Sequence, residues 1–223
     1  MSAGRRGGAC ACGLLLGLLL IAVAPLAALD PDRRLTQYRV ETWGVEEGLP
    51  SLSVAVVTQT PDGYLWIGTT EGLASFDGVR FRTYDRWNTP AFRLNEIRSL
   101  FVDSRGALWI GFAGSGVVVR ERGEFVAVEP SDLTAVNFAE DADGVLLGTD
   151  RGLFHRRHDA PLRFAPVPAA ATLSGDLIFR VTHDRRGRTW LNVLKRGVFW
   201  LDGGELRGPL SFGSPSGLGD EYS

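Results

Sequence analysis

Hydrophobic positions in this chain fall into short runs separated by turns that contain glycine, and the same order of runs returns four times. The clearest unit begins with the β-branched run Val54 to Gln59 and passes through a Pro-Asp-Gly turn into the apolar run Leu65 to Thr69. The unit continues with a second glycine turn and the run Leu73 to Phe76. It ends with an Asp-Gly turn and the run Val79 to Tyr84. Runs of this length between such turns predict four antiparallel strands.

The turn glycines after the first run recur about every 40 residues, at Gly63, Gly106, Gly144 and Gly187. A period of this length with four short strands is typical of a β-propeller blade. Inner strands of a blade are covered on both faces, which explains why Leu65-Trp66-Ile67 contains no polar residue. The sequence therefore predicts an all-β propeller of four-stranded antiparallel blades, with about four blades at residues 54–84, 97–128, 135–167 and 177–212.

The first 28 residues have a different composition. Arg5 and Arg6 precede an apolar run, Leu14 to Val23, and small residues follow as far as Ala28. This order is typical of a secretory signal peptide, whose cleavage near Ala28 would remove both cysteines of the chain. The run is short for a membrane span, and a signal anchor is the alternative. We expect residues 1–28 to be a signal peptide and the protein to be periplasmic or otherwise extracytoplasmic.

The charge of the chain argues against one class of partner. It has 24 Lys and Arg against 26 Asp and Glu, a formal net charge of −2, with no basic run. Nucleic-acid binding needs a basic patch or stripe that neutralises phosphates. We therefore expect no nucleic-acid partner.

Residues with catalytic or metal-binding chemistry are few. The segment His155 to Asp159 offers two imidazoles and a carboxylate, but strand positions three apart point to opposite faces, so we expect a solvated outer strand or turn there and no metal site. No glycine segment has the spacing of a phosphate-binding or dinucleotide-binding loop. Several aspartates lie in glycine turns, where they are expected to cap their own backbone: Asp62, Asp77, Asp143 and Asp202. The sequence therefore predicts no enzyme, no cofactor and no metal centre.

The loops supply the candidate binding residues. Connections of an antiparallel sheet alternate between its two ends, so the turn after the second strand shares one end with the loops between blades. Exposed aromatics mixed with Arg and Asn are typical of a recognition surface. The candidate ligand-binding residues at this end are Glu71, Trp87, Phe92, Arg93, Asn95 and Arg151. The alternative is a solvated loop whose Trp87 or Phe92 packs onto the blade, and mid-strand Trp66, Trp109 and Trp190 are expected in the core.

Four segments closely resemble the two-component regulator propeller repeat: Gly48-Leu49-Pro50-Ser51, Thr58 to Thr69, Gly72-Leu73 and Phe76 to Phe81. The resemblance extends from Leu35 to the last residue and is strongest in the first two units. In that family such repeats build extracytoplasmic propellers that form the sensing half of membrane histidine kinases, hybrid kinases or diguanylate cyclases. The resemblance implies a non-catalytic sensing region that binds a small molecule or a glycan.

The resemblance also implies an incomplete, open propeller. The chain has four units, fewer than the family's propellers, and contains no kinase or cyclase sequence. The family's opening segment, matched by Leu35 to Trp43 within the lead-in residues 29–53, commonly supplies a strand to the last blade. Gly217 to Ser223 resembles the lead-in to a further blade. We therefore expect further blades and an output domain downstream, an inner-membrane anchor in the full-length parent, and any homodimer to form through that parent.

Two alternatives to a sensor remain open. The first is a free-standing secreted propeller that binds a protein or a polysaccharide. The second is a propeller lyase or hydrolase that acts at the channel, which would need a convergent set of His, Asp or Glu side chains.

Overall fold

The computed structural model describes residues 40–114 and 116–210. The chain divides into a first unit, Met1–Glu41, of which residues 40 and 41 are described, and a second unit, Thr42–Ser223, which holds every strand below. The expected signal peptide, residues 29–39 of the lead-in and the segment Gly217 to Ser223 lie outside the described residues. The described lead-in residues, 40–53, form turns and bends without a strand. No helix in the described part of the chain is long and apolar enough to cross a membrane.

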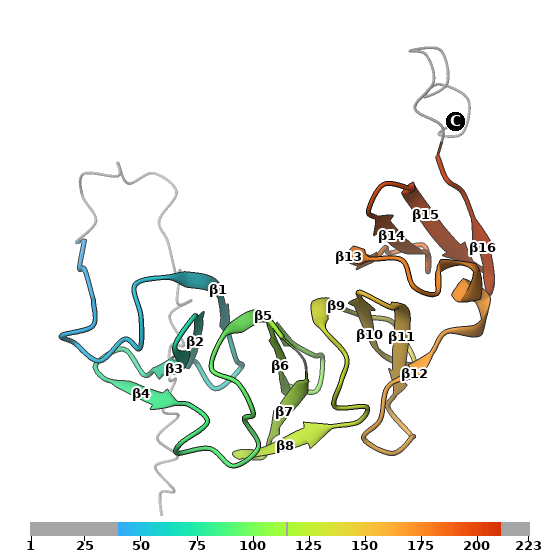
Figure 1. The fold of residues 1–223 in the computed structure, drawn as a ribbon. Helices are drawn as coiled ribbons and strands as arrows, with labels where there is room; N and C mark the ends of the chain where they lie inside the picture. Colours follow the sequence, from blue (N-terminus) through green and yellow to red (C-terminus); the bar gives the residue numbers. More distant parts are fainter. Residues whose placement is uncertain (1–39, 115, 211–223) are drawn as a thin grey trace, which may run out of the picture. The chain divides into compact units, whose positions relative to one another are not determined.

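The second unit contains four antiparallel sheets, and each has four strands in sequence order (Figure 1). The first sheet consists of β1 (Val54–Gln59), β2 (Leu65–Thr69), β3 (Gly72–Phe76) and β4 (Phe81–Tyr84), and the second of β5 (Ile97–Val102), β6 (Leu108–Phe112), β7 (Val117–Glu121) and β8 (Glu124–Val128). The third consists of β9 (Ala135–Glu140), β10 (Gly144–Thr149), β11 (Gly152–Arg157) and β12 (Ala165–Pro166), and the fourth of β13 (Ile178–His183), β14 (Thr189–Val193), β15 (Gly197–Asp202) and β16 (Glu205–Arg207). The predicted four-stranded antiparallel blades are confirmed.

Consecutive blades pack against each other through their first strands, β1 on β5, β5 on β9 and β9 on β13 (Figure 1). One buried apolar cluster fills each of these three interfaces. Hydrogen bonds between first strands also cross two of these interfaces. Ser99 Oγ donates to the Ala135 carbonyl oxygen (3.3 Å), and the Val181 N–H donates to Asn137 Oδ1 (2.7 Å). No strand pairing joins the first sheet to the fourth among the described residues, as expected of an incomplete propeller.

A glycine on the second strand lets each blade approach the next one closely. A Cβ atom added at Gly68, Gly111 or Gly148 would lie 2.6 Å from an atom of the following blade's first strand, namely Ile97 Cγ2, Ala135 Cβ and the Ile178 carbonyl oxygen, respectively. Real Cβ atoms do not tolerate such contacts, so these positions require glycine. The equivalent register position in the fourth blade is Asn192, against which the described chain places no further sheet.

In the second blade, the side chain of Asp103 connects the turn between the first and second strands to the blade core. Asp103 Oδ1 accepts hydrogen bonds from the N–H groups of Arg105 (3.1 Å) and Ala107 (2.8 Å), while Asp103 Oδ2 accepts from Trp109 Nε1 (2.9 Å). The first blade uses a hydroxyl instead, since Thr60 Oγ1 accepts from Trp66 Nε1 (2.9 Å). Each indole N–H, buried with its ring, therefore has a partner, as burial requires.

The fourth blade repeats this arrangement with Asp184. Its Oδ2 accepts from Trp190 Nε1 (2.8 Å), and its Oδ1 accepts from the N–H groups of Arg186 (2.9 Å) and Arg188 (3.0 Å). The pKa of Asp184 lies far below its ordinary value. The Trp190 indole N–H, the backbone N–H of Arg188 and the Arg188 guanidinium cause this shift, because each of them stabilises the carboxylate.

The third blade has lost the tryptophan, and a histidine replaces its contribution. Leu146 occupies the register position of the tryptophan and is buried, while Asp141 still accepts from the N–H groups of Asp143 (2.9 Å) and Gly144 (2.8 Å). His155 Nε2 lies 3.3 Å from Asp141 Oδ1. Burial raises the pKa of Asp141, but His155 and the two N–H groups outweigh it, so that this pKa lies below its ordinary value. The turn cap predicted for Asp143 is therefore made by Asp141.

Candidate functional site

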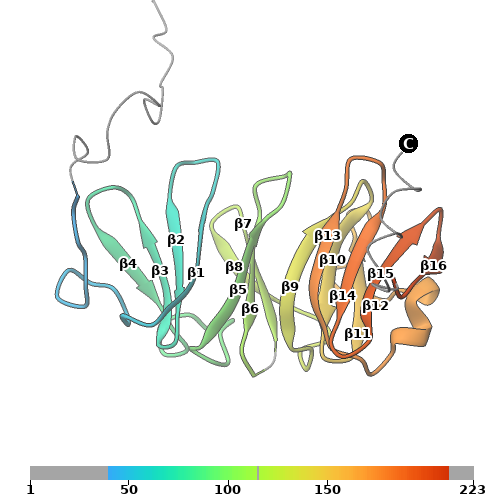
Figure 2. The ribbon, with the colours of Figure 1, turned by 90° about the horizontal axis from the view of Figure 1, so that it is seen from above.

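The connections alternate between the two ends of the sheets, as predicted (Figure 2). One end, which we call the loop face, carries the turns after the second strands and the loops between blades. Hydrogen bonds from the Ala113 N–H to the Glu96 carbonyl oxygen (3.0 Å) and from the Gly116 N–H to the Leu133 carbonyl oxygen (2.8 Å) join the β6–β7 turn to the loops on both sides of it. The loop face is therefore connected at this turn, which is held by the loops on both sides of it.

Phe92, in the loop between β4 and β5, is a core residue. Its side chain is 3% exposed, and its ring centroid lies 5.1 Å from that of Phe112 and 5.3 Å from that of Phe125. The prediction that Phe92 is an exposed aromatic is wrong, because the loop turns this ring into the interface of the first two blades, where its apolar surface is removed from water. Leu133 and Leu173, in the next two connections between blades, are fully buried in the interfaces of the second and third and of the third and fourth blades, respectively. Each loop between blades thus contributes at least one buried apolar side chain to the core.

Trp87 is exposed and carries a stacked cation. The side chain is 74% exposed, and the guanidinium carbon of Arg86 lies 3.9 Å from its ring centroid. Asp85 Oδ1 accepts from the Trp87 N–H (2.8 Å), and Asn95 Oδ1 accepts from the Arg86 N–H (2.9 Å). Asn95 therefore uses its carbonyl oxygen to shape the loop that presents Trp87.

Arg93 and Arg151 reach the same segment of the next loop. Arg93 Nη1 donates to Ser131 Oγ (3.2 Å), while Arg151 Nη2 donates to the Asp132 carbonyl oxygen (2.6 Å) and lies 3.0 Å from Asp132 Oδ2. Glu71 is exposed in the β2–β3 turn, and its carboxylate has no partner in the part of the chain that the structure describes. The structure thus brings Arg93 and Arg151 together and keeps Trp87 and Glu71 accessible to solvent.

The two histidines of the third blade each face a carboxylate. His158 Nε2 lies 3.3 Å from Glu140 Oε1, and the Ser104 N–H and hydroxyl both donate to Glu140 (2.8 Å each), which joins the second blade to the third. The side chains of His155 and His158 are 20% and 12% exposed, so the expectation of a solvated strand or turn is wrong in its exposure for both side chains, although His158 does lie in the turn after β11. Among the residues that the structure describes, no group of three or more His, Cys, Asp or Glu is placed to hold a metal ion.

The sequence comparisons identify the repeat. Residues 48–71 and 91–114 match a family model described as "Two component regulator propeller". Both segments run from the loop before a blade to the turn after its second strand, so they cover equivalent parts of the first two blades. No curated protein matches the chain.

Three solved structures share the fold. The extracellular domain of the hybrid two-component system BT3049 from B. thetaiotaomicron is 22% identical with a TM-score of 0.62, over 76% of this chain and 26% of that one. The extracellular domain of the hybrid two-component system BT4673 from the same organism is 18% identical with a TM-score of 0.59, over 70% of this chain and 22% of that one. PorZ, a surface component of the type-IX secretion system of Porphyromonas gingivalis, is 14% identical with a TM-score of 0.53, over 71% and 27%.

At these identities the similarity to the solved structures shows the fold, and the chain spans about a quarter of the length of each. The family match adds what the fold alone does not show. Residues 48–71 and 91–114 match two-component regulator propeller repeats, and they lie in the first two of four β-propeller blades.

Proposed function

We propose that this chain is the non-catalytic, extracytoplasmic ligand-sensing region of a two-component or diguanylate cyclase signalling protein. The observation that carries the proposal is the match of two segments to regulator propeller repeats, in a fold shared with the extracellular domains of two hybrid two-component systems. A fold hosts many functions, so the repeat match supports the signalling role more strongly than the fold does. The membrane anchor and the output domain would lie in other parts of the parent protein.

The loop face is the surface on which we place the sensed ligand. Exposed Trp87, with the Arg86 guanidinium over its ring, offers a stacking surface and N–H donors for a sugar ring or a small planar molecule. Arg93 lies on the loop before the second blade and binds Ser131 on the loop after it. A ligand that binds Trp87 and Arg93 would therefore interact with an element that connects two blades. Such differential contact is what lets a ligand shift an arrangement of blades.

The proposal is tested by thermal-shift screening of the purified protein against neutral and acidic mono- and oligosaccharides. We expect at least one sugar to raise the melting temperature, since binding to the native state stabilises it. Trp87→Ala and Arg93→Ala should abolish this shift, because both remove groups from the loop face.

Asp77→Ala and Arg122→Ala are the matched controls for this screen. Both residues lie in turns after a third strand, at the opposite end of the sheets, and should leave the shift unchanged. A screen without any shift, or a shift that depends on Asp77 or Arg122 and not on Trp87, would reject the loop face as the sensing surface.

A further inference from the structure

A hollow lies between the outer strands of the first two blades. Its volume is about 570 Å³, which is in the range of small-molecule sites. Strand β4 of the first blade and strands β7 and β8 of the second line it, and residues 88–91 of the loop between the blades complete its wall. Neither Trp87, Arg93 nor Arg151 lines it, so it is distinct from the candidate residues of the loop face.

Aromatic rings form the apolar part of this hollow. The Tyr84 and Phe125 ring centroids are 4.9 Å apart, and both rings line the cavity from opposite blades. The buried Trp66 lies behind them, 5.7 Å from Tyr84 and 6.4 Å from Phe125. A flat apolar group in the hollow would contact partly exposed rings that are held in place by the core.

Arg120 extends over these rings with part of its hydrogen-bonding capacity unused. Its guanidinium carbon lies 4.9 Å from the Trp66 ring centroid and 5.9 Å from that of Phe125. Its Nε is buried without a hydrogen-bond partner, and no carboxylate in the described part of the chain pairs with this side chain. A buried N–H group without a partner is costly, and a guanidinium pairs best with a carboxylate that accepts from two of its nitrogens.

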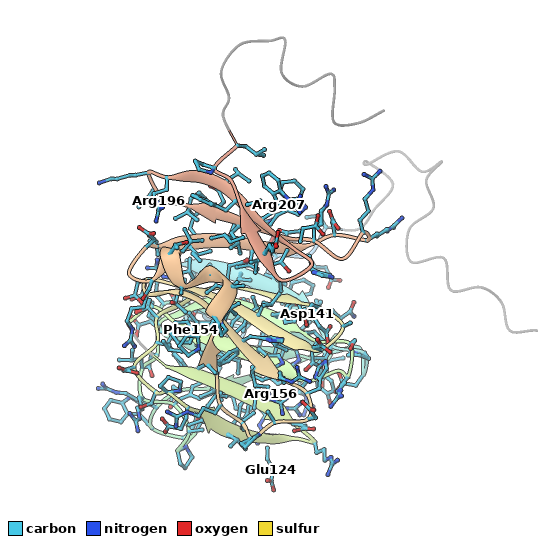
Figure 3. All side chains as sticks on the ribbon, turned by 90° about the vertical axis from the view of Figure 1, so that its right-hand side faces the viewer. Glu124, Asp141, Phe154, Arg156, Arg196 and Arg207 are labelled. Atoms are coloured by element: carbon cyan, nitrogen blue, oxygen red, sulfur yellow. The ribbon has the colours of Figure 1, made fainter. Side chains whose placement is uncertain are left out.

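A second arginine faces the same hollow. Arg82 on β4 is exposed, and its guanidinium carbon lies 5.2 Å from the Tyr84 ring centroid, without a carboxylate partner among the described residues. The acidic lining residue is Glu124, whose side chain is exposed and projects outward from the ribbon (Figure 3). The hollow therefore combines two guanidinium groups that have no ion-pair partner among the described residues, one carboxylate at the rim and an aromatic wall.

The interface between the second and third blades also places an arginine over a tryptophan, but there a buried phenylalanine takes the place of the open cavity. Arg156 lies 5.8 Å from the Trp109 ring centroid, and its Nε is also buried without a hydrogen-bond partner. There, however, Phe164 is 2% exposed and packs 5.7 Å from Trp109, whereas Phe125 at the first interface lines an open cavity. Packing alone accounts for an arginine over a tryptophan at both interfaces. The open volume and the second arginine distinguish the first.

We propose that this hollow binds a small carboxylate whose body is a ring. Arg120 and Arg82 bind the carboxylate, and Tyr84 and Phe125 contact the ring. An aromatic acid and an acidic sugar share this chemistry. The proposal stands apart from the sensing role of the loop face, because it concerns other residues.

The test is calorimetric titration of the purified protein with benzoate and with glucuronate, and with benzamide and glucose as their neutral analogues. We expect one of the two acids to bind, and its neutral analogue to bind at least about tenfold more weakly, the loss of roughly one charge-assisted hydrogen bond. Binding of benzoate alone identifies an aromatic acid, and binding of glucuronate alone identifies an acidic sugar.

Variants assign the binding to this hollow. Arg82→Gln should weaken the bound acid about tenfold, whereas Arg98→Gln, an equal loss of charge at an exposed position on β5, should leave it unchanged. Glu124→Gln should tighten binding about two- to threefold, because it removes a nearby like charge. Arg82, Arg98 and Glu124 are exposed, so these changes preserve the fold, and a thermal midpoint for each variant checks this.

The proposal is overturned if neither acid binds at about 10 mM, which is weaker than ordinary specific sites, or if the neutral analogues bind equally well. Equal weakening by Arg98→Gln and Arg82→Gln would reduce the effect to net charge. Inorganic phosphate that binds as tightly as both acids would show an unselective anion site. Trp87→Ala should leave acid binding intact, which separates this test from that of the loop face.

Discussion

Replacing Trp109 by alanine should lower the free energy of unfolding by about 3 to 5 kcal/mol. The ring is 1% exposed and packs against Phe138 and Phe164, with centroid distances of 6.4 and 5.7 Å. Its removal leaves a cavity between the second and third blades and takes away the indole N–H that Asp103 accepts. A loss of this size is a large part of the stability of an ordinary domain. Trp66→Ala should behave alike, because Trp66 is equally buried at the first interface.

Urea denaturation followed by circular dichroism measures this loss. Trp87→Ala is the matched control, since its ring is 74% exposed, and it should change the free energy of unfolding by no more than about 0.5 kcal/mol. A Trp109→Ala midpoint close to that of the unchanged protein would show that this ring does not hold the two blades together.

Gly111→Ala should destabilise the chain by about 1 to 3 kcal/mol, although alanine is only one methyl group larger. The added Cβ would overlap Ser99 Oγ and would lie 2.6 Å from Ala135 Cβ, so β9 of the third blade would have to move away. That movement would also strain the Ser99–Ala135 hydrogen bond across the interface. Gly111→Val should be more damaging because the added volume is larger.

Gly44→Ala is the control for this substitution. The nearest atoms to a Cβ at Gly44 are 3.4 and 3.7 Å away, and its backbone does not require glycine. We expect an effect within about 0.5 kcal/mol in the same urea titration. Equal midpoints for Gly111→Ala and Gly44→Ala would contradict the close packing of the second and third blades.

The glycine turns and apolar runs predicted the strands well, because turn chemistry and blade burial act locally on the sequence. The runs Val54 to Gln59 and Leu65 to Thr69 are strands with these bounds. The predicted strand Val79 to Tyr84 begins later, at Phe81, because Asp77 Oδ1 accepts the N–H groups of Val79 and Arg80 (2.8 Å each) and keeps both residues in the turn.

The burial of loop residues between blades was harder to predict from the polarity of the surrounding sequence. Phe92 lies in a polar loop and Leu173 ends the short 3-10 helix Pro168–Leu173, and each stands at the same offset before the first strand of the next blade, as Leu49 does. That repeated offset was a usable signal for burial. The shared spacing from Asp103 to Trp109 and from Asp184 to Trp190 was a second signal, and it marks the carboxylate that ties each turn to its indole.

The candidate site was predictable in part. Alternating connections placed Arg93 and Arg151 at one end of the sheets, but the sequence did not show that both would bind the loop at Ser131 and Asp132. The hollow between β4 and β8 was not predictable, because its walls come from two blades and depend on their packing.

The central claim, that these blades are the exported sensing region of a larger signalling protein, is tested most directly on the native protein. An antibody raised against residues 40–210 is used to blot membrane and soluble fractions, before and after protease is added to intact spheroplasts. The account predicts a membrane-bound species much heavier than a 223-residue chain, whose blades the protease destroys. A soluble species of the size of this chain, or one protected from protease inside the spheroplasts, would contradict it.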